Sequence, residues 1–129
     1  MASEKIGNVK IDTLFASQDN LNKLLETNVK ASTAYKLSRI ATKVSEELKI
    51  CEETRRNLVM EYGEEDENGT TKVTEENRET FNNEINDLFQ NEIELPFEKI
   101  SIDDLVSSRG VEADITPTTL VGLEWLFKD

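Results

Sequence analysis

The stretch TAYKLSRIATKVSEELKICEETRRNLVMEY, residues 33–62, decides the fold of this chain. Its apolar side chains recur at helical spacing, and one series repeats every seven residues: Leu37, Val44, Cys51 and Leu58. No Gly or Pro interrupts the stretch, so it predicts one helix of roughly 30 residues, about 45 Å long. Such a helix is longer than a 129-residue globule is wide. We therefore expect one end to project or to pack on another chain.

A second helix is expected after the acidic loop EYGEEDENGTTKV, residues 61–73. Gly63 stands where a C′ glycine would end the long helix. Asn68-Gly69 is a strong turn signal, and Thr74 is the predicted N-cap of the second helix. That helix has an apolar stripe at helical spacing: Phe81, Ile85, Leu88 and Phe89. The pattern predicts an antiparallel helical hairpin over about 33–90.

Two short segments alternate apolar and polar residues, which is typical of half-buried strands. They are residues 6–12, around Val9, and residues 92–102, around Pro96. We expect them to pair as a small sheet, with Pro96 at an edge because it cannot donate to a ladder. A change of phase predicts a bulge near Glu98 and Lys99.

Short helices are expected to flank this core. Ser17 is the predicted N-cap of one, and Ser101 of another that would stop at Gly110. Thr116 and Pro117 start a C-terminal helix over about 117–127. That helix is apolar almost all the way round, so it is either well buried or docked on a partner. Its candidate interface residues are Leu120, Leu123, Trp125 and Phe127. The predicted fold class is α+β, in a single domain over residues 1–129.

The acidic loop partly matches the ligand pattern of a calcium-binding EF-hand. With Gly69 at loop position 6, the ligands would be Glu64, Asp66, Asn68 and Glu75. Glu64 is too long for position 1, and Lys72 places a cation at position 9. No second loop is present to form the usual pair. The turn of a helical hairpin is therefore the preferred interpretation, and no metal or cofactor is expected.

The chain has few of the residue types and motifs that support catalysis. It has no His, the commonest general base and metal ligand, and no glycine-rich phosphate loop. Cys51 lies on the apolar stripe of the long helix and is predicted to be a buried hydrophobe. We therefore expect a protein that is not an enzyme. Arg55 lies on the same stripe, and two interpretations are open. Either its aliphatic stem packs on the stripe while its guanidinium reaches the surface, or the guanidinium forms an ion pair with an acid of the second helix or of another subunit.

Charge is distributed unevenly along the chain. Of the net charge of −12, residues 46–104 contribute −13 and the remaining residues +1. This balance argues against direct binding to nucleic acid or to an anionic membrane, which requires Lys and Arg. It allows a basic protein partner, a mimic of nucleic acid, or simply a well-solvated surface. No apolar run approaches a membrane span, and residues 1–10 lack the apolar region of a signal peptide, so an intracellular protein is expected.

The chain resembles a family of small uncharacterised proteins encoded by phages and prophages. The resemblance covers most of residues 20–127 and rests on four segments: KASTAYKLSRIATKV, EEL…EETRRNLVMEYGEEDENG, EIELPFEKISIDDL and ITPTTLVGLEWLF. It implies a phage protein in the host cytoplasm or the virion, and it transfers no catalytic residue.

Two functions are compatible with these features. The first is a non-enzymatic phage protein that acts by protein–protein interaction and self-associates, either in virion assembly or as an accessory component. The over-long helix and the apolar terminal helix favour this function, since both need more surface than one small domain supplies. The second is an acidic inhibitor of a host defence or nucleic-acid enzyme, with the acids of residues 46–104 mimicking phosphates.

Overall fold

A computed structural model describes residues 4–106, 110 and 115–128 of the chain. Its elements, in chain order, are β1 (Lys5–Lys10), α1 (Ile11–Leu25), α2 (Ala31–Tyr62), β2 (Gly63–Glu65), β3 (Thr71–Val73), α3 (Arg78–Gln90), β4 (Glu92–Glu98), the 3-10 turn η1 (Ile102–Asp104) and α4 (Pro117–Val121). Helices dominate, and the strands form two separate two-stranded sheets, β1–β4 and β2–β3. The predicted α+β class is confirmed.

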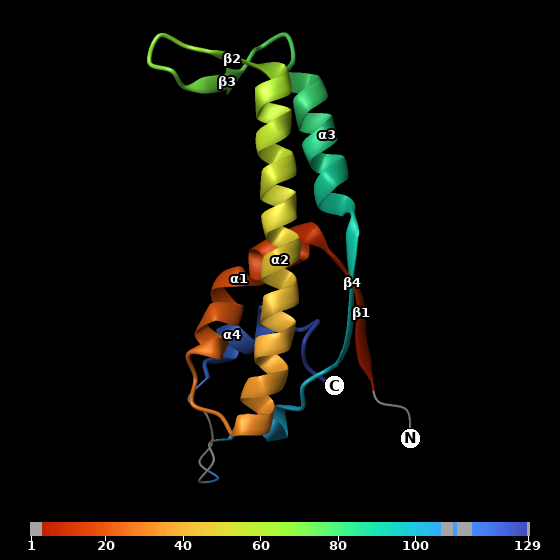
Figure 1. Cartoon of the computed structure of the whole chain (residues 1–129). Coiled ribbons are helices and arrows are strands. Elements are labelled where there is room, and N and C mark those ends of the chain that lie inside the picture. Colours follow the sequence, from red (N-terminus) through yellow and green to blue (C-terminus); the bar gives the residue numbers. More distant parts are fainter. Residues whose placement is uncertain (1–3, 107–109, 111–114, 129) are drawn as a thin grey trace.

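The 32-residue helix α2 is the spine of the molecule (Figure 1). Its buried side chains all lie in its first two thirds: Thr33, Leu37, Ile40, Val44, Leu48 and Cys51. Beyond Cys51 the helix continues past the core, and α3 returns antiparallel beside this second part. The predicted helical hairpin is therefore present. We call residues 52–90, which comprise the end of α2, the β2–β3 hairpin and α3, the arm.

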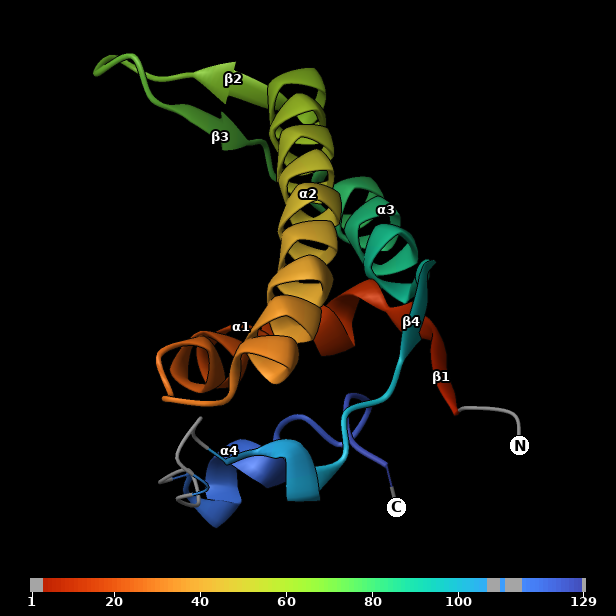
Figure 2. The ribbon, with the colours of Figure 1, turned by 60° about the horizontal axis from the view of Figure 1, so that its bottom comes forward.

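The core surrounds the first part of α2. Helix α1 crosses α2 there, the β1–β4 sheet lies along another side, and α4 packs on α1 (Figures 1 and 2). The core side chains outside α2 are Val9, Ile11, Leu14, Leu21, Leu24, Ile93, Leu95, Ile100, Leu105, Leu123, Leu126 and Phe127. The start of α2 is fixed by η1 and the residues that follow it, because Lys30 N donates to Val106 O at 2.6 Å and Thr33 Oγ1 to Asp104 O at 2.9 Å.

The predicted small sheet is antiparallel, with Val9 opposite Ile93. Its first strand is shorter than expected, because Ile11 begins α1 and does not continue β1. The register shifts between Lys5 and Gly7, opposite the Pro96 region of β4. The irregularity thus lies slightly before the predicted bulge at Glu98 and Lys99. Gly7 has a φ of 75° there, a conformation that side-chain-bearing residues seldom adopt.

The prediction that Ser17 caps a helix is wrong. Helix α1 starts at Ile11, so Ser17 lies inside it and is buried. Its hydroxyl donates to Thr13 O at 2.7 Å and accepts a hydrogen bond from Trp125 Nε1 at 2.9 Å. Buried hydroxyls need such partners. Ser17 therefore joins α1 to the C-terminal segment.

The C-terminal helix is also shorter than the predicted 117–127. Thr116 is its N-cap and accepts from Thr119 N, as expected, but α4 ends at Val121 and turns follow. Phe127 then forms a parallel bridge with Ile100. The physical reason is burial. A continuous helix would leave one side of its apolar surface in water, whereas this path places Leu123, Leu126 and Phe127 in the core.

Ser101 precedes only the 3-10 turn η1 and makes no side-chain capping bond, so the helix predicted after it is reduced to one turn. Its predicted stop lies next to residues 107–109 and 111–114, which are outside the described residues.

Candidate interaction surface

The arm has no core of its own. All of residues 52–90 are described, and none of them is buried. The apolar side chains between its helices and hairpin are only half buried: Leu58, Val59, Tyr62, Val73, Phe81, Ile85, Leu88 and Phe89. On the outer side of α2, Met60 is 66% exposed. Nearly a third of the chain therefore extends into solvent with a single layer of apolar contacts.

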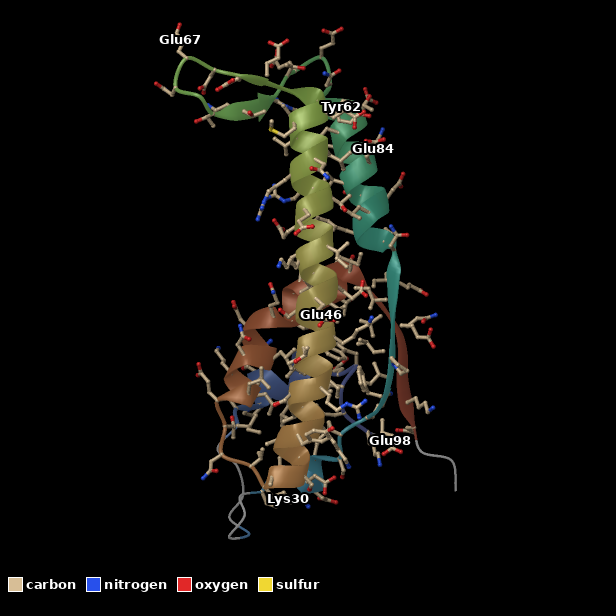
Figure 3. All side chains as sticks on the ribbon, viewed as in Figure 1. Lys30, Glu46, Tyr62, Glu67, Glu84 and Glu98 are labelled. Atoms are coloured by element: carbon tan, nitrogen blue, oxygen red, sulfur yellow. The ribbon has the colours of Figure 1, made fainter. Side chains whose placement is uncertain are left out.

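Contacts at both ends hold α3 in place. Near the end of the arm, the Tyr62 hydroxyl faces the carboxylate of Glu84 on α3, and Figure 3 shows these side chains on adjacent helices. Hydrogen bonding to Glu84, burial and the negative charges of Glu84 and Glu61 raise the pKa of Tyr62. At the base, the rings of Phe15 and Phe89 meet edge to face with centroids 5.5 Å apart.

The loop between the helices is a β-hairpin, whose two strands the sequence analysis missed. Gly63 ends α2 where predicted, but it is the C-cap residue and the start of β2, with an extended φ of −108°, and not a C′ glycine. Gly63 is required for space instead, because a Cβ there would collide with the backbone oxygens of Val59 and Lys72. The predicted turn is confirmed: Gly69 has a φ of 80°, and its N–H donates to Asp66 O at 3.1 Å.

Thr74 is not the N-cap of α3. The helix begins at Arg78, and residues 75–77 form a turn before it. Thr74 Oγ1 is buried and has no hydrogen-bond partner among the described residues. Asn77, at the actual N-cap, donates its side-chain amide to Tyr62 O at 3.2 Å. The Asn77 side chain thus does not cap the helix but joins it to the end of α2.

The four residues of the metal hypothesis are spread along this hairpin. Glu64 is in β2, Asn68 is in the turn and Glu75 lies beyond β3. Asp66 Oδ1 accepts from the backbone N–H groups of Asn68 and Thr70 at 2.9 and 3.0 Å, so it organises the turn. In the part of the chain that the structure describes, no three acidic or sulfur ligands gather in one place.

The end of the arm is strongly acidic. Residues 61–67, which we call the arm tip, carry five acids and no base. Glu64, Glu65 and Glu67 are exposed, and Figure 3 places Glu67 at the outer end of the hairpin. Asp66 lies 3.9 Å from Lys72 Nζ, the only ion pair that the described residues make here. Most of the tip carboxylates therefore face solvent without a cation.

A basic surface lies far from this tip, where the first turns of α2 meet the end of β4. A groove of about 300 Å³ is lined there by Lys5, Lys36, Arg39, Ile40, Pro96, Phe97 and Glu98. We call it the basic groove. The Arg39 guanidinium lies over the Phe97 ring at 5.3 Å and the Tyr35 ring at 5.9 Å. In Figure 3, Glu98 marks its position near the opposite end of the molecule from Glu67.

The basic side chains that line the groove differ from neighbouring lysines of the same region, which form ion pairs. Lys30 pairs with Asp104 at 3.1 Å, and Lys43 with Glu47 at 2.9 Å. The hydrogen bond to Glu47 also raises the pKa of Lys43. Lys5, Lys36 and Arg39 form no ion pair with any residue that the structure describes.

The other predicted interface residues lie elsewhere. Leu123 and Phe127 belong to the chain's own core, which corrects their assignment to an interface. Leu120 and Trp125 are half buried beside them. Arg55 pairs with Glu52 of its own helix at 3.1 Å, so among the described residues it forms no ion pair with the second helix, and a pair with another subunit stays a prediction. Glu52 lies about one helical turn before Arg55, so the two side chains are neighbours on the same face of α2.

Cys51 offers no exposed nucleophile. It is buried at the end of the core, and burial raises the pKa of its thiol, with a further rise from the Glu52 carboxylate. A protonated, enclosed thiol is unreactive. Within the described residues, no helix combines the length and apolarity needed to cross a bilayer.

The sequence did contain a signal for the basic groove. Residues 27–45 carry four bases and no acid, directly before the acidic stretch. Only the fold, however, brings Lys5 and Phe97 to the same place. In comparisons with known proteins, no family model, no curated protein and no solved structure matches this chain.

Proposed function

We propose that this chain is a non-enzymatic protein that acts by protein–protein interaction and self-associates through its arm. Because the chain resembles phage proteins, we place it in a virion, an assembly intermediate or an accessory complex in the host cytoplasm. One observation carries the proposal: none of residues 52–90 is buried.

The physical argument concerns the cost of ordering the arm. Each ordered residue loses about 1–2 kcal/mol of backbone conformational entropy, which burial of apolar surface must offset. The arm buries little, and an isolated two-stranded hairpin such as β2–β3 is at best marginally stable in water. A contact on the arm would cover its half-buried apolar side chains and add the missing stabilisation.

Light scattering combined with amide hydrogen exchange tests this function. We expect the molar mass to rise with protein concentration, and exchange in residues 52–90 to slow in parallel. Exchange around the buried Leu37 should stay constant and serves as the internal control. A molecule that remains monomeric at high concentration, with exchange in the arm unchanged, would contradict self-association.

The exposed acids of the arm tip favour a second function, inhibition of a host defence or nucleic-acid enzyme by phosphate mimicry. A protruding hairpin with five acids in seven residues could enter a basic cleft. In this case the partner would be a different protein, and the affinity of this chain for that partner would fall steeply as the salt concentration rises. Reversing the charges of the basic groove would leave that affinity unchanged.

A further inference from the structure

The arm tip and the basic groove have opposite charges and lie at opposite ends of the molecule (Figures 1 and 3). We propose that the arm tip of one copy docks into the basic groove of a second copy, in a head-to-tail contact. This inference rests on the proposed self-association and names the two surfaces that carry it.

The groove has the chemistry to bind carboxylates. Lys5, Lys36 and Arg39 converge on it, and Glu98 is the one acid among its lining residues. The Phe97 and Tyr35 rings position the Arg39 guanidinium by cation–π contact while its N–H donors remain free. A guanidinium presents a planar fork of donors that matches the two oxygens of a carboxylate. Three positive charges near one acid thus leave a net attraction for an acidic segment.

The arm tip supplies that segment. Glu64, Glu65 and Glu67 are exposed, and their carboxylates make no hydrogen bond or ion pair with any residue that the structure describes. The hairpin that carries them projects away from α2 and α3 in both views (Figures 1 and 2). Its carboxylates can therefore enter a shallow groove without a clash between the bodies of the two molecules. A volume of about 300 Å³ suits a few side chains better than a large ligand.

The two surfaces cannot meet within one molecule. Arg39 and Tyr62 are separated by 23 residues of one continuous helix, which spans about 35 Å at 1.5 Å per residue. The tip must therefore find its groove on another copy. Because tip and groove are different surfaces, the contact is heterologous, and each copy keeps one tip and one groove free. Repetition of the contact closes a ring or extends a filament.

Charge reversal tests the contact in both directions. The groove variant is Lys36→Glu/Arg39→Glu, and the tip variant is Glu64→Lys/Glu65→Lys/Glu67→Lys, which leaves the tip with a net positive charge. Sedimentation velocity in low salt should show association of the unmodified protein and its loss in high salt, where charge interactions are screened. Each variant alone should be monomeric, because tip and groove then carry the same sign. An equimolar mixture should associate again, since every tip meets a groove of opposite charge.

The control variant is Lys23→Glu/Lys49→Glu, which changes net charge as much as the groove variant but lies outside the groove. It should associate like the unmodified protein, and circular dichroism should show that all variants are folded. Variants that still associate alone, or a mixture that stays monomeric, would overturn the head-to-tail contact. If the unmodified protein associates but charge reversal has no effect, only this inference fails. If it never associates, the proposed self-association fails as well.

Discussion

At the scale of single residues, two threonines differ in what their hydroxyls contact. Thr116 Oγ1 accepts from Thr119 N at 3.3 Å and lies 3.0 Å from Thr119 Oγ1, so it caps α4. Thr74 Oγ1 is buried without a partner among the described residues. Both residues have the sequence signature of an N-cap, but only one performs that role. The hydrogen-bond partner, not the residue type, determines what each contributes to stability.

These contacts predict opposite outcomes for two substitutions. Thr116→Ala should destabilise the protein by about 1 kcal/mol, the usual cost of losing a capping side chain. Thr74→Val keeps the shape and removes an unpaired buried hydroxyl, so it should be neutral or stabilise by up to about 1 kcal/mol. Urea denaturation of both variants gives the comparison. A loss of stability in Thr74→Val equal to that in Thr116→Ala would show that Thr74 does act as a cap.

At the scale of secondary-structure elements, α2 and α3 meet near the arm tip, where the Tyr62 hydroxyl faces the Glu84 carboxylate and can hydrogen-bond to it. The hydrogen bond and partial burial favour the neutral phenol and raise its pKa above the ordinary value of 10.0. The stabilising effect is therefore fully present below about pH 10, the pKa of an unfolded tyrosine. It is lost as the pH rises through the higher pKa of the folded state.

An alkaline titration checks this contact. We expect the tyrosinate absorbance of the unmodified protein, minus that of Tyr62→Phe, to titrate with a midpoint above pH 10. Glu84→Gln removes the carboxylate that accepts the hydrogen bond, so the midpoint should fall toward the ordinary value. A difference curve centred at or below pH 10 would rule out the hydrogen bond between the helices.

At the scale of the whole molecule, stability is concentrated at one end. The side chains of α2 up to Cys51 are enclosed by α1, the β1–β4 sheet and the C-terminal segment, whereas those beyond it face α3, the small β2–β3 hairpin and solvent. Local opening is easiest where few apolar contacts must break. We therefore expect the arm to open at a lower free energy than the core, even though one helix runs through both.

The same substitution at two positions of α2 measures this difference. Leu48 is 3% exposed in the core, and Leu58 is half buried in the arm. Leu48→Ala should cost about 2–5 kcal/mol of unfolding free energy, as for other buried leucines. Leu58→Ala should cost about 1 kcal/mol, because less apolar area leaves water there. Urea denaturation in high salt and at low concentration, where association is suppressed, provides the test. Equal costs would mean that the arm has a core of its own.

Much of the fold follows from local sequence. The helical spacing of residues 33–62 predicts α2 almost to its ends, because a long uninterrupted apolar stripe is compatible with little else. The alternation within residues 92–102 predicts β4, although the strand ends at Glu98, and Thr116-Pro117 predicts the start of α4. Asn68-Gly69 predicts the turn of the hairpin. Each of these signals acts over a few residues, through spacing, dihedral angle or capping, so it can be identified without the rest of the chain.

The remaining features depend on contacts between distant residues. Ser17 has the sequence of a cap but is buried, because Trp125 donates to it from 108 residues away. The predicted C-terminal helix unwinds after Val121, because its apolar side chains are needed in a core that other elements form. The basic groove exists only where α2 meets β1 and β4. Thus the sequence alone determined the long helix, the turn of the hairpin, the start of α4 and the uneven charge. Tertiary structure decided which polar groups found partners, and it placed the free acids and free bases at opposite ends of one helix.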